Sequence, residues 1–427
     1  MQEQNSVSQL KDLIDHGTSP FHVVSKSIDR LRQEGFVALD LRESWRLSPG
    51  GKYFCRPFDG ELFAFTVNGK DALLSPPRFA AAHTDFPALK IKPSPDICSN
   101  GYRTLNVEIY GGPLLHTFFD RPLSVSGKVA LTSPDIFHPD IRFVDFRRPI
   151  LIIPSLAIHM NPKANEGTPV DAQIHLKPLA GTADETASFM DHLARELDCS
   201  VSDILDFELY VYNHDPLEVV GLDGTFISSP RLDNLTSVSA LLSGIIHGKR
   251  PSGINVIALF DNEEIGSRTK QGADSALFRI LLEKIVKGLD PAASCMENLL
   301  AGMLLSVDVA HAFHPNYPSV YDPVNRPLCG QGIVIKTDSS QGYAWDCEGV
   351  AIIQGLCSKY RIPSQRFAKH SGKRGGSTLG SMLSSLLPVV TVDIGVPILA
   401  MHSARETMGV DDQIHLDQLL NAYFSQA

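Results

Sequence analysis

Residues 254–269 read Ile-Asn-Val-Ile-Ala-Leu-Phe-Asp-Asn-Glu-Glu-Ile-Gly-Ser-Arg-Thr, a mostly apolar run followed by two adjacent glutamates. The run Ile254–Phe260 predicts a buried strand. Open α/β sheets bind ligands beyond the carboxyl ends of their strands, so we expect Glu263 and Glu264 at such an edge. Two carboxylates that face one site repel each other unless a cation or a shared proton intervenes. The pair therefore predicts a metal centre, although an isolated Glu-Glu pair can also be a solvated turn.

Composition narrows the class of protein. The chain has 427 residues, 43% hydrophobic and 20% charged, as in soluble globular enzymes of two or three domains. The net charge of −10 argues against nucleic acid or an anionic membrane as a partner. The seven cysteines show no CxxC spacing, which predicts reduced thiols and a cytoplasmic location. The longest apolar stretch, Ile150–Ile158, contains Pro154 and is too short to span a bilayer.

Periodicity predicts an α/β fold with a mostly parallel central sheet and helices on both faces. Within residues 226–427, strand-like runs alternate with helical segments. We expect helices within residues 6–35, 233–247 and 274–289, and buried strands at 254–260, 303–307 and 389–395. Residues 53–68 alternate like a hairpin, with Asn68-Gly69 as its turn. Many short β-like segments predict an inserted β-rich domain over 92–223, within a discontinuous catalytic domain of residues 1–91 and 224–427.

Further metal-ligand residue types follow apolar runs or open a helix. His83, Asp308 and His402 each come directly after an apolar run, and Asp233 begins a helical segment. Singly, such residues are as readily a turn, a helix cap or a core histidine. Together with Glu264 they form a nitrogen and oxygen ligand set without cysteine, which fits zinc, manganese or cobalt. Asp85 follows two residues after His83 and could orient its imidazole.

The chain resembles the aspartyl aminopeptidase family of two-metal zinc aminopeptidases nearly end to end. The resemblance is carried by Ser19-Pro20-Phe21-His22, Ala82-His83-Thr84-Asp85, Tyr110-Gly111-Gly112-Pro113, Arg231-Leu232-Asp233-Asn234, Phe260-Asp261-Asn262-Glu263-Glu264-Ile265-Gly266-Ser267, Ser306-Val307-Asp308, Ala310-His311-Ala312-Phe313-His314-Pro315-Asn316 and Met401-His402-Ser403-Ala404-Arg405-Glu406. It implies the phosphorylase/hydrolase-like zinc peptidase fold, with the β-rich insert acting as a lid and dimerisation domain.

The resemblance also implies roles for the ligand set, with two zinc ions as the cofactor. His83 and Asp308 would hold one ion, Glu264 and His402 would hold the other, and Asp233 would bridge them. Glu263 would be the general base that takes a proton from a water between the ions, and Asp85 would support His83.

Oligomerisation is a further implication, because members of this family typically form dodecamers. A histidine from a neighbouring subunit's insert then reaches the active site, and His159 matches that element. A surface-loop histidine is the alternative for His159. Lys336 matches a position near the substrate, where a lysine could bind an acidic first residue, and a solvated lysine is the alternative. Tyr343 lies in a further segment that we expect beside the substrate.

Several positions depart from the family pattern in segments expected near the substrate. These are Phe86 where the family usually has serine, Pro122 for aspartate, Gly342 for arginine, Gly372 for aspartate and Gly375 for cysteine. We therefore expect an aminopeptidase that releases Asp or Glu from a free amino terminus, with neutral first residues left open. Two alternatives remain: a related two-metal amidohydrolase that deacylates blocked amines, and a non-catalytic self-assembling scaffold whose ligands only stabilise the fold.

Overall fold

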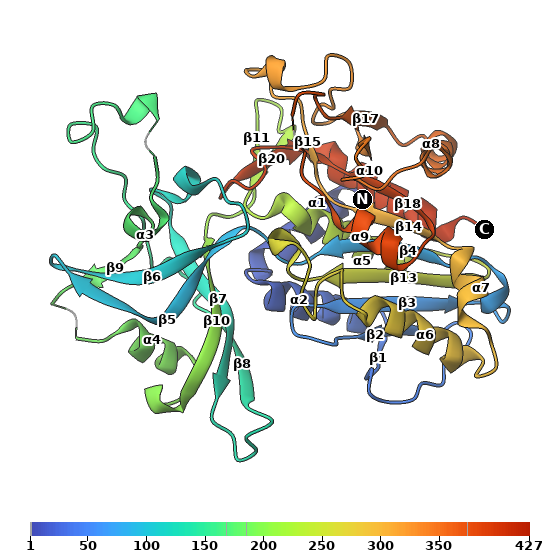
Figure 1. The fold of residues 1–427 in the computed structure, drawn as a ribbon, viewed down its shortest axis with the longest axis horizontal. Helices are drawn as coiled ribbons and strands as arrows, with labels where there is room; N and C mark the ends of the chain where they lie inside the picture. Colours follow the sequence, from blue (N-terminus) through green and yellow to red (C-terminus); the bar gives the residue numbers. More distant parts are fainter. Residues whose placement is uncertain (1, 168, 185, 374) are drawn as a thin grey trace. The chain divides into compact units, whose positions relative to one another are not determined.

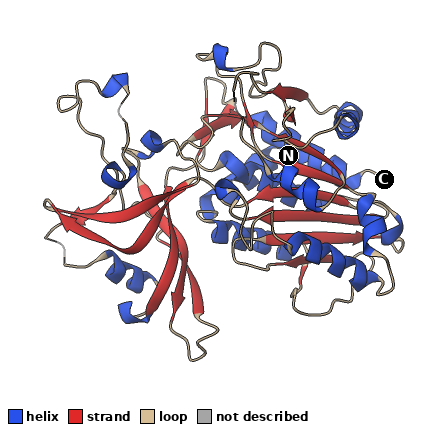
Figure 2. Cartoon of the chain, in the orientation of Figure 1, coloured by secondary structure: helices blue, strands red, loops and turns tan. Residues whose placement is uncertain are grey.

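The computed structural model describes residues 2–167, 169–184, 186–373 and 375–427, and the chain divides into two compact units. The first unit comprises Met1–Asp85, Leu217–Met401 and Glu406–Ala427. The second comprises Phe86–Pro216 and the short segment His402–Arg405. The predicted insert, 92–223, shares residues 92–216 with the second unit. Figure 2 shows that the first unit mixes helices and strands, whereas strands predominate in the second.

A nine-stranded sheet lies at the centre of the first unit, as far as the described residues extend, in the order β1-β2-β3-β13-β4-β14-β18-β16-β17. The four neighbours β13, β4, β14 and β18 run parallel, and β3 and β16 are antiparallel to the strands that they flank. The bounds are β1 Val37–Ala38, β2 Lys52–Cys55, β3 Leu62–Asn68, β4 Arg78–His83, β13 Gly253–Phe260, β14 Met303–Val307, β16 Ile333–Thr337, β17 Ser364–Ala368 and β18 Val390–Gly395. The predicted mostly parallel sheet is thus confirmed.

Helices cover both faces of this sheet (Figure 1). On one face α6 and α9 bury apolar side chains against Phe63, Phe79 and Phe260. On the other face α5 packs against β4 and β13 and also against α1 and α10. The bounds are α1 Gln2–His16, α2 Pro20–Gln33, α5 Leu232–His247, α6 Leu277–Leu289, α7 Cys295–Leu300, α8 Cys347–Tyr360, α9 Leu379–Leu386 and α10 Val410–Ser425. In the described part of the chain, no helix is apolar over enough turns to cross a bilayer.

A smaller mixed sheet also belongs to the first unit. It pairs its strands in the order β11-β12-β20-β19-β15. The bounds are β11 Glu218–Val220, β12 Phe226–Ser229, β15 Ala310–His311, β19 Pro397–Leu399 and β20 Glu406–Gly409.

Short 3₁₀ helices occur in both units, at η1 Ala72–Leu74, η2 Leu115–Phe118, η3 Ala164–Glu166, η4 Val201–Asp203, η5 Glu263–Ile265 and η6 Pro318–Val320.

The second unit is built on an antiparallel sheet in the order β8-β7-β10-β5-β6-β9. One amphipathic helix, α4, buries Phe189 and Leu193 in a core with residues of β6, β7 and β10. The bounds are β5 Ala88–Ser99, β6 Tyr102–Tyr110, β7 Leu123–Leu131, β8 Asp140–Asp145, β9 Leu179–Thr182, β10 Ile204–Asn213, α3 Ala172–His175 and α4 Phe189–Glu196. The β-rich character predicted for this part of the chain is confirmed.

The predicted hairpin turn at Asn68-Gly69 is wrong. Strands β2 and β3 do pair antiparallel, but residues 56–61 connect them, and Asn68 instead ends β3. The Asn-Gly signal marks a turn of the chain, and periodicity alone does not show which two strands a turn joins.

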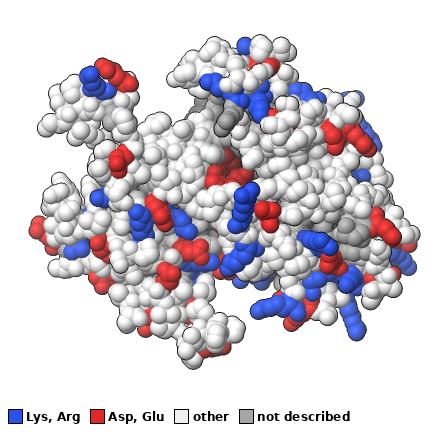
Figure 3. Space-filling model, in the orientation of Figure 1, with Lys and Arg blue, Asp and Glu red and all other residues white. Residues whose placement is uncertain are grey.

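On the face drawn in Figure 3, basic and acidic side chains of the described residues are intermixed.

Candidate metal centre

The predicted residues converge because three neighbouring parallel strands end at the same edge of the sheet. His83 is the last residue of β4, Asp308 follows β14, and the Glu263–Glu264 pair follows β13. Strand β4 pairs with β13 on one side, with His83 opposite Phe260, and with β14 on the other. The carboxyl ends of parallel strands are where α/β sheets present functional groups.

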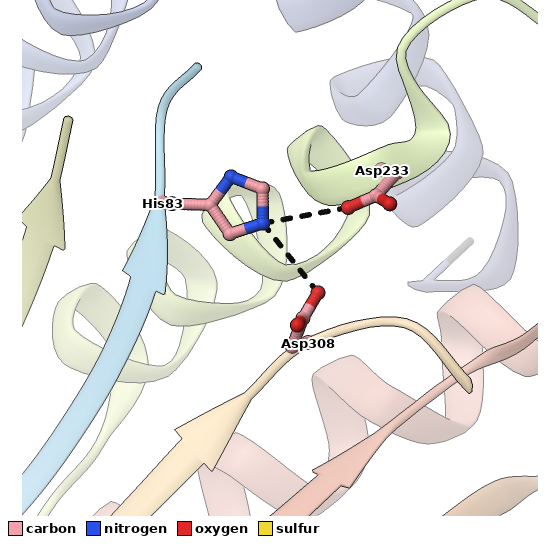
Figure 4. A group of neighbouring side chains, drawn as sticks. All are labelled: His83, Asp233 and Asp308. Atoms are coloured by element: carbon pink, nitrogen blue, oxygen red, sulfur yellow. Dashed lines mark ion pairs between the residues drawn. The ribbon is translucent and has the colours of Figure 1, made fainter. Parts of the chain in front are cut away.

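His83, Asp233 and Asp308 form a compact buried group (Figure 4). The Nε2 atom of His83 lies 3.4 Å from Oδ1 of Asp233 and 3.5 Å from Oδ1 of Asp308. The three residues are 1%, 4% and 8% exposed. One nitrogen and two carboxylate oxygens thus face a common point that is largely removed from solvent.

Asp233 is held by backbone geometry at the start of α5. Its φ and ψ of −79° and 104° are not helical, and the Asp233-Asn234 peptide bond is cis. The backbone N–H of Asp233 donates to Oε2 of Glu406 at 3.0 Å. The Nδ2 atom of Asn234 donates to the carbonyl oxygen of Val307, the residue before Asp308. Sequence reasoning gave Glu406 no role, and its only signal was its place in the Met401–Glu406 motif.

The two glutamates lie on the 3₁₀ turn η5, and Asp85 anchors that turn. Oδ1 of Asp85 accepts the backbone N–H of Glu263, and Oδ2 accepts that of Glu264, both at 3.1 Å. Asp85 also holds His83, because Nδ1 of His83 lies 2.9 Å from its carbonyl oxygen and 3.4 Å from Oδ1. Oε2 of Glu263 lies 4.0 Å from Nε2 of His83. Ligand atoms of His83, Glu263 and Glu264 all lie within 4.8 Å of one another.

The charges of this group call for a cation. Burial alone would lower the pKa of His83, but hydrogen bonds to Asp233, Asp308 and Asp85 outweigh it and hold that pKa well above its usual range. Burial raises the pKa of Glu263 to about 8, and the negative charges of Asp308, Asp85 and Asp233 act in the same direction. Carboxylates this close together need positive charge between them.

A divalent metal fits the same donors. Imidazole nitrogen and carboxylate oxygens are ligands that zinc accepts, and the His83 ring is oriented through Nδ1, which leaves Nε2 to face the carboxylates. Zinc, manganese and cobalt are all compatible with a nitrogen and oxygen set of this kind. A buried group with this donor chemistry, beside a glutamate whose pKa lies near neutrality, is typical of metal-dependent hydrolases.

Comparison with known proteins agrees with this geometry. The family model described as "Aminopeptidase I zinc metalloprotease (M18)" matches residues 13–424. The chain belongs to the M18 family. A probable M18 family aminopeptidase 2 of Clostridium novyi (strain NT) is 39% identical over 424 residues, which cover 98% of each chain.

Solved structures show the same fold for this M18 chain. Ape4, in the cryo-EM structure of the Ape4 and Nbr1 complex, is similar with a TM-score of 0.93 and 30% identity, over 99% of this chain and 86% of that one. The S. cerevesiae mApe1 dodecamer gives a TM-score of 0.83 and 25% identity, over 99% of this chain and 96% of that one. The chain is therefore an M18 zinc metallo-aminopeptidase, as the sequence resemblance implied.

Two predicted histidines of the M18 chain lie in the second unit. His402 is in the segment His402–Arg405, where its Nδ1 lies 3.0 Å from the carbonyl oxygen of Gly112. A proton on Nδ1 would leave the lone pair on Nε2, the tautomer that a metal ligand needs. His159 is exposed on a turn of this unit. The roles of both residues stay predictions.

Lys336 and Tyr343, which the sequence placed near the substrate, are both buried in the structure of this M18 chain. Lys336 is 1% exposed, and its Nζ donates to the carbonyl oxygen of Val309 at 2.9 Å and lies 4.0 Å from Oδ2 of Asp308. The ammonium also sits 5.0 Å from the ring centroid of Tyr343, which is 6% exposed. Lys336 thus neighbours a predicted metal ligand, a contact that its position in the sequence did not reveal.

Proposed function

We propose that this chain is a dinuclear-metal aminopeptidase that releases the first residue from peptides with a free amino terminus. The observation that carries the proposal is the buried group of His83, Asp233 and Asp308 next to the Glu263–Glu264 turn. The family match supports a metallo-aminopeptidase, and the closeness of these side chains supports the roles that we propose for them.

In this proposal two zinc ions bind at the edge of the sheet. His83 and Asp308 would hold one ion, Glu264 and His402 would hold the other, and Asp233 would contribute to both sites. When bound, the ions supply Lewis acidity that polarises the scissile carbonyl and makes a water molecule acidic at neutral pH.

The chain's own residues handle the proton and the geometry. Glu263 takes a proton from the attacking water and delivers it to the leaving amine. Asp85 holds both glutamates at their backbone N–H groups and orients His83. His159 of a neighbouring subunit stabilises the carbonyl oxygen as it gains charge.

Acidic first residues are the proposed preference, with neutral residues as weaker substrates. The support is Lys336, a buried ammonium beside Asp308, which could pair with a substrate carboxylate. Tyr343 packs under that ammonium and would fix its position. Glycine at position 342, where the resembling family has arginine, leaves one cation fewer near this segment, so neutral residues can also be accepted.

A homo-oligomer, the dodecamer that the similar mApe1 forms, is the proposed assembly. The support in this chain is the loop of residues 155–161 in the second unit. Leu156, Ile158 and Met160 on this loop are 65%, 48% and 76% exposed. Contiguous exposed apolar side chains mark surfaces that bind another protein, and His159 lies among them.

A peptide assay on the metal-restored protein tests the proposed function. The chain is stripped with a chelator, reloaded with zinc, manganese or cobalt, and given peptides that begin with Asp, Glu, Leu or Lys, each with a free or an acetylated terminus. We expect cleavage of free termini only, fastest for Asp and Glu. Faster cleavage of acetylated substrates would assign the chain to the deacylases, and metal binding without any hydrolysis would assign it to the scaffolds.

A further inference from the structure

Asp393, on β18, is a fully buried residue that binds a segment about fifty residues before it in the chain. It is 0% exposed and is not among the residues assigned to the metal centre. Its Oδ2 accepts the backbone N–H of Ala344 at 2.5 Å, and its own backbone N–H donates to the carbonyl oxygen of Ala344 at 2.9 Å. Two hydrogen bonds thus hold Ala344, the residue directly after Tyr343.

The second carboxyl oxygen of Asp393 binds the start of α9. Oδ1 accepts the hydroxyl of Thr378 at 2.7 Å, and the backbone N–H of Thr378 donates to the carbonyl oxygen of Gly342 at 3.2 Å. A Cβ at Gly380 would lie 2.4 Å from Oδ2 of Asp393, so the first turn of α9 packs directly on the carboxyl group. Hydrogen bonds therefore hold the residues on both sides of Tyr343.

Strand register places Lys336 beside Asp393. In the antiparallel β16–β18 ladder, Ile335 pairs with Ile394. Continuing that register by one residue puts Lys336 opposite Asp393, and side chains directly opposite each other in such a pair project from the same face, with Cβ atoms roughly 5 Å apart. Burial raises the pKa of Asp393, and the positive charge of Lys336 is the largest effect that opposes this shift.

Tyr343 contacts the same ammonium through its ring. The ring centroid lies 5.0 Å from Nζ of Lys336, within the range of a cation–π contact. The ring also meets that of Phe367 edge to face, with centroids 6.0 Å apart, and the residue is 6% exposed. The surroundings of the ammonium therefore depend on a ring whose neighbouring backbone is bound by Asp393.

We propose that Asp393 is a positioning residue: by binding the backbone of Ala344 it holds the Tyr343 ring against the Lys336 ammonium, and so sets how well an acidic first residue is bound. A buried polar group whose oxygens are both bonded restricts the movement of its partners. Asp393 itself does not contact the substrate, because it is fully buried. The inference rests on the proposed role of Lys336 in binding a substrate carboxylate.

Hydrogen exchange followed by mass spectrometry tests the bond to Ala344 without any activity measurement. The zinc-restored natural chain, Asp393→Asn and Asp393→Leu are compared over peptides that contain residue 344. Asp393→Asn keeps an acceptor oxygen, so exchange should stay within about threefold of the natural rate. Asp393→Leu has no acceptor, and the segment should exchange at least about tenfold faster. Natural exchange in Asp393→Leu overturns the proposal.

Kinetics with different first residues test the effect on substrate choice. Asp393→Leu should lower kcat/KM for Asp- and Glu-initiated peptides about tenfold more than for Leu-initiated ones, mostly through KM, because a displaced binding group weakens ground-state and transition-state binding alike. Asp393→Asn should keep the natural ratio to within about twofold. A loss shared equally by all first residues would mean that Asp393 only stabilises the fold, and overturns the proposal.

Asp417→Leu is the matched control, since it removes another buried carboxyl group, one that accepts Nε2 of Gln413 at 2.9 Å on α10. It should lower the melting temperature and leave the substrate ratio within about twofold of the natural value. The same shift of the ratio in Asp417→Leu as in Asp393→Leu would assign that shift to general destabilisation and overturn the proposal. Should Asp393→Leu fail to fold, Asp393→Ser gives the same comparison, because its side chain is one bond shorter than that of aspartate.

A double-mutant cycle tests the link to Tyr343. In a Tyr343→Leu background, Asp393→Leu should change the substrate ratio by less than about twofold, since the ring on which Asp393 acts is absent. Independent, multiplicative shifts would overturn the link. Hydrogen exchange separates the two possible failures: a natural chain without a preference for acidic residues overturns the proposed preference, whereas natural exchange in Asp393→Leu overturns the inference itself.

Discussion

Asp85 accepts the backbone N–H of Glu263 through Oδ1 at 3.1 Å, and its second oxygen does the same for Glu264. The Asp85 carboxylate, two residues after the end of β4, therefore fixes the positions of both glutamates beyond the end of β13. Asp85→Asn keeps one acceptor oxygen and Asp85→Ala keeps none. We expect kcat to fall about tenfold in the first and about 100-fold in the second. Equal activity of the two variants would contradict this role.

The two glutamates should separate in metal content and turnover. Glu263→Gln should retain its metal and lose turnover by about 100- to 10,000-fold, since a glutamine cannot move a proton. Glu264→Gln should bind less metal, because an amide is a weaker ligand than a carboxylate. Metal analysis of the two purified proteins beside kcat measures both effects. Metal loss in Glu263→Gln would make Glu263 a ligand instead.

Lys336 should govern the preference for the first residue. Lys336→Met is expected to lower kcat/KM for Asp- and Glu-initiated peptides about 10- to 100-fold more than for Leu-initiated ones, because a hydrogen-bonded charge pair is lost. Lys359→Met, at the end of α8 where Nζ donates to Gln426, is the control and should change neither. An equal loss for all substrates would show that Lys336 acts by holding Asp308, from which it lies 4.0 Å.

Asp412 should make stability depend on pH. It is buried at the start of α10 and accepts the backbone N–H groups of Gly330, Gly332 and Gly409, yet burial outweighs these bonds and raises its pKa from 3.8 to about 7. A raised carboxyl pKa means that the folded state binds the proton more tightly. The contribution of Asp412 to the free energy of unfolding is therefore complete below pH 4 and is lost as the pH rises through 7.

The size of this contribution is on the order of 4 kcal/mol between the two limits. Urea unfolding between pH 4 and 8 should show the decline in the natural chain and a flatter profile in Asp412→Asn. Asp290→Asn removes the same charge from an exposed residue after α6 and should leave the slope unchanged. A slope that survives in Asp412→Asn would assign it to other groups.

The exposed apolar loop of the second unit should control assembly. Met160→Asp puts a charge where we propose that a neighbouring subunit binds, and analytical ultracentrifugation should show a smaller species. Leu74→Asp alters a side chain that is 82% exposed in the first unit and should leave the mass unchanged. Activity should fall with the mass if His159 of a neighbour reaches the site. An intact assembly in Met160→Asp would move the interface elsewhere.

Local sequence determined much of the catalytic unit. The mostly apolar run Ile254–Phe260 predicted a buried strand, and every residue of that run is buried from solvent in β13. The residues after β4, β13 and β14 were predicted to lie at one edge because neighbouring parallel strands end at the same edge of a sheet. Residue type alone then gave nitrogen and oxygen ligands. Asn68-Gly69 shows the limit of this reasoning, since a turn signal does not identify the strand that follows in space.

Tertiary structure decided what depends on contacts between distant residues. Asp85 lies 178 residues before Glu263, and its bond to that backbone is not visible in any spacing. Glu61 looks like an ordinary polar residue after a glycine, and only the packing at the start of β3 makes it a fully buried acid. Patterns along the chain fix which groups are available. Tertiary packing determines how deeply each group is buried and which groups lie beside it. Burial and neighbours then determine the charge of each group and so its chemistry.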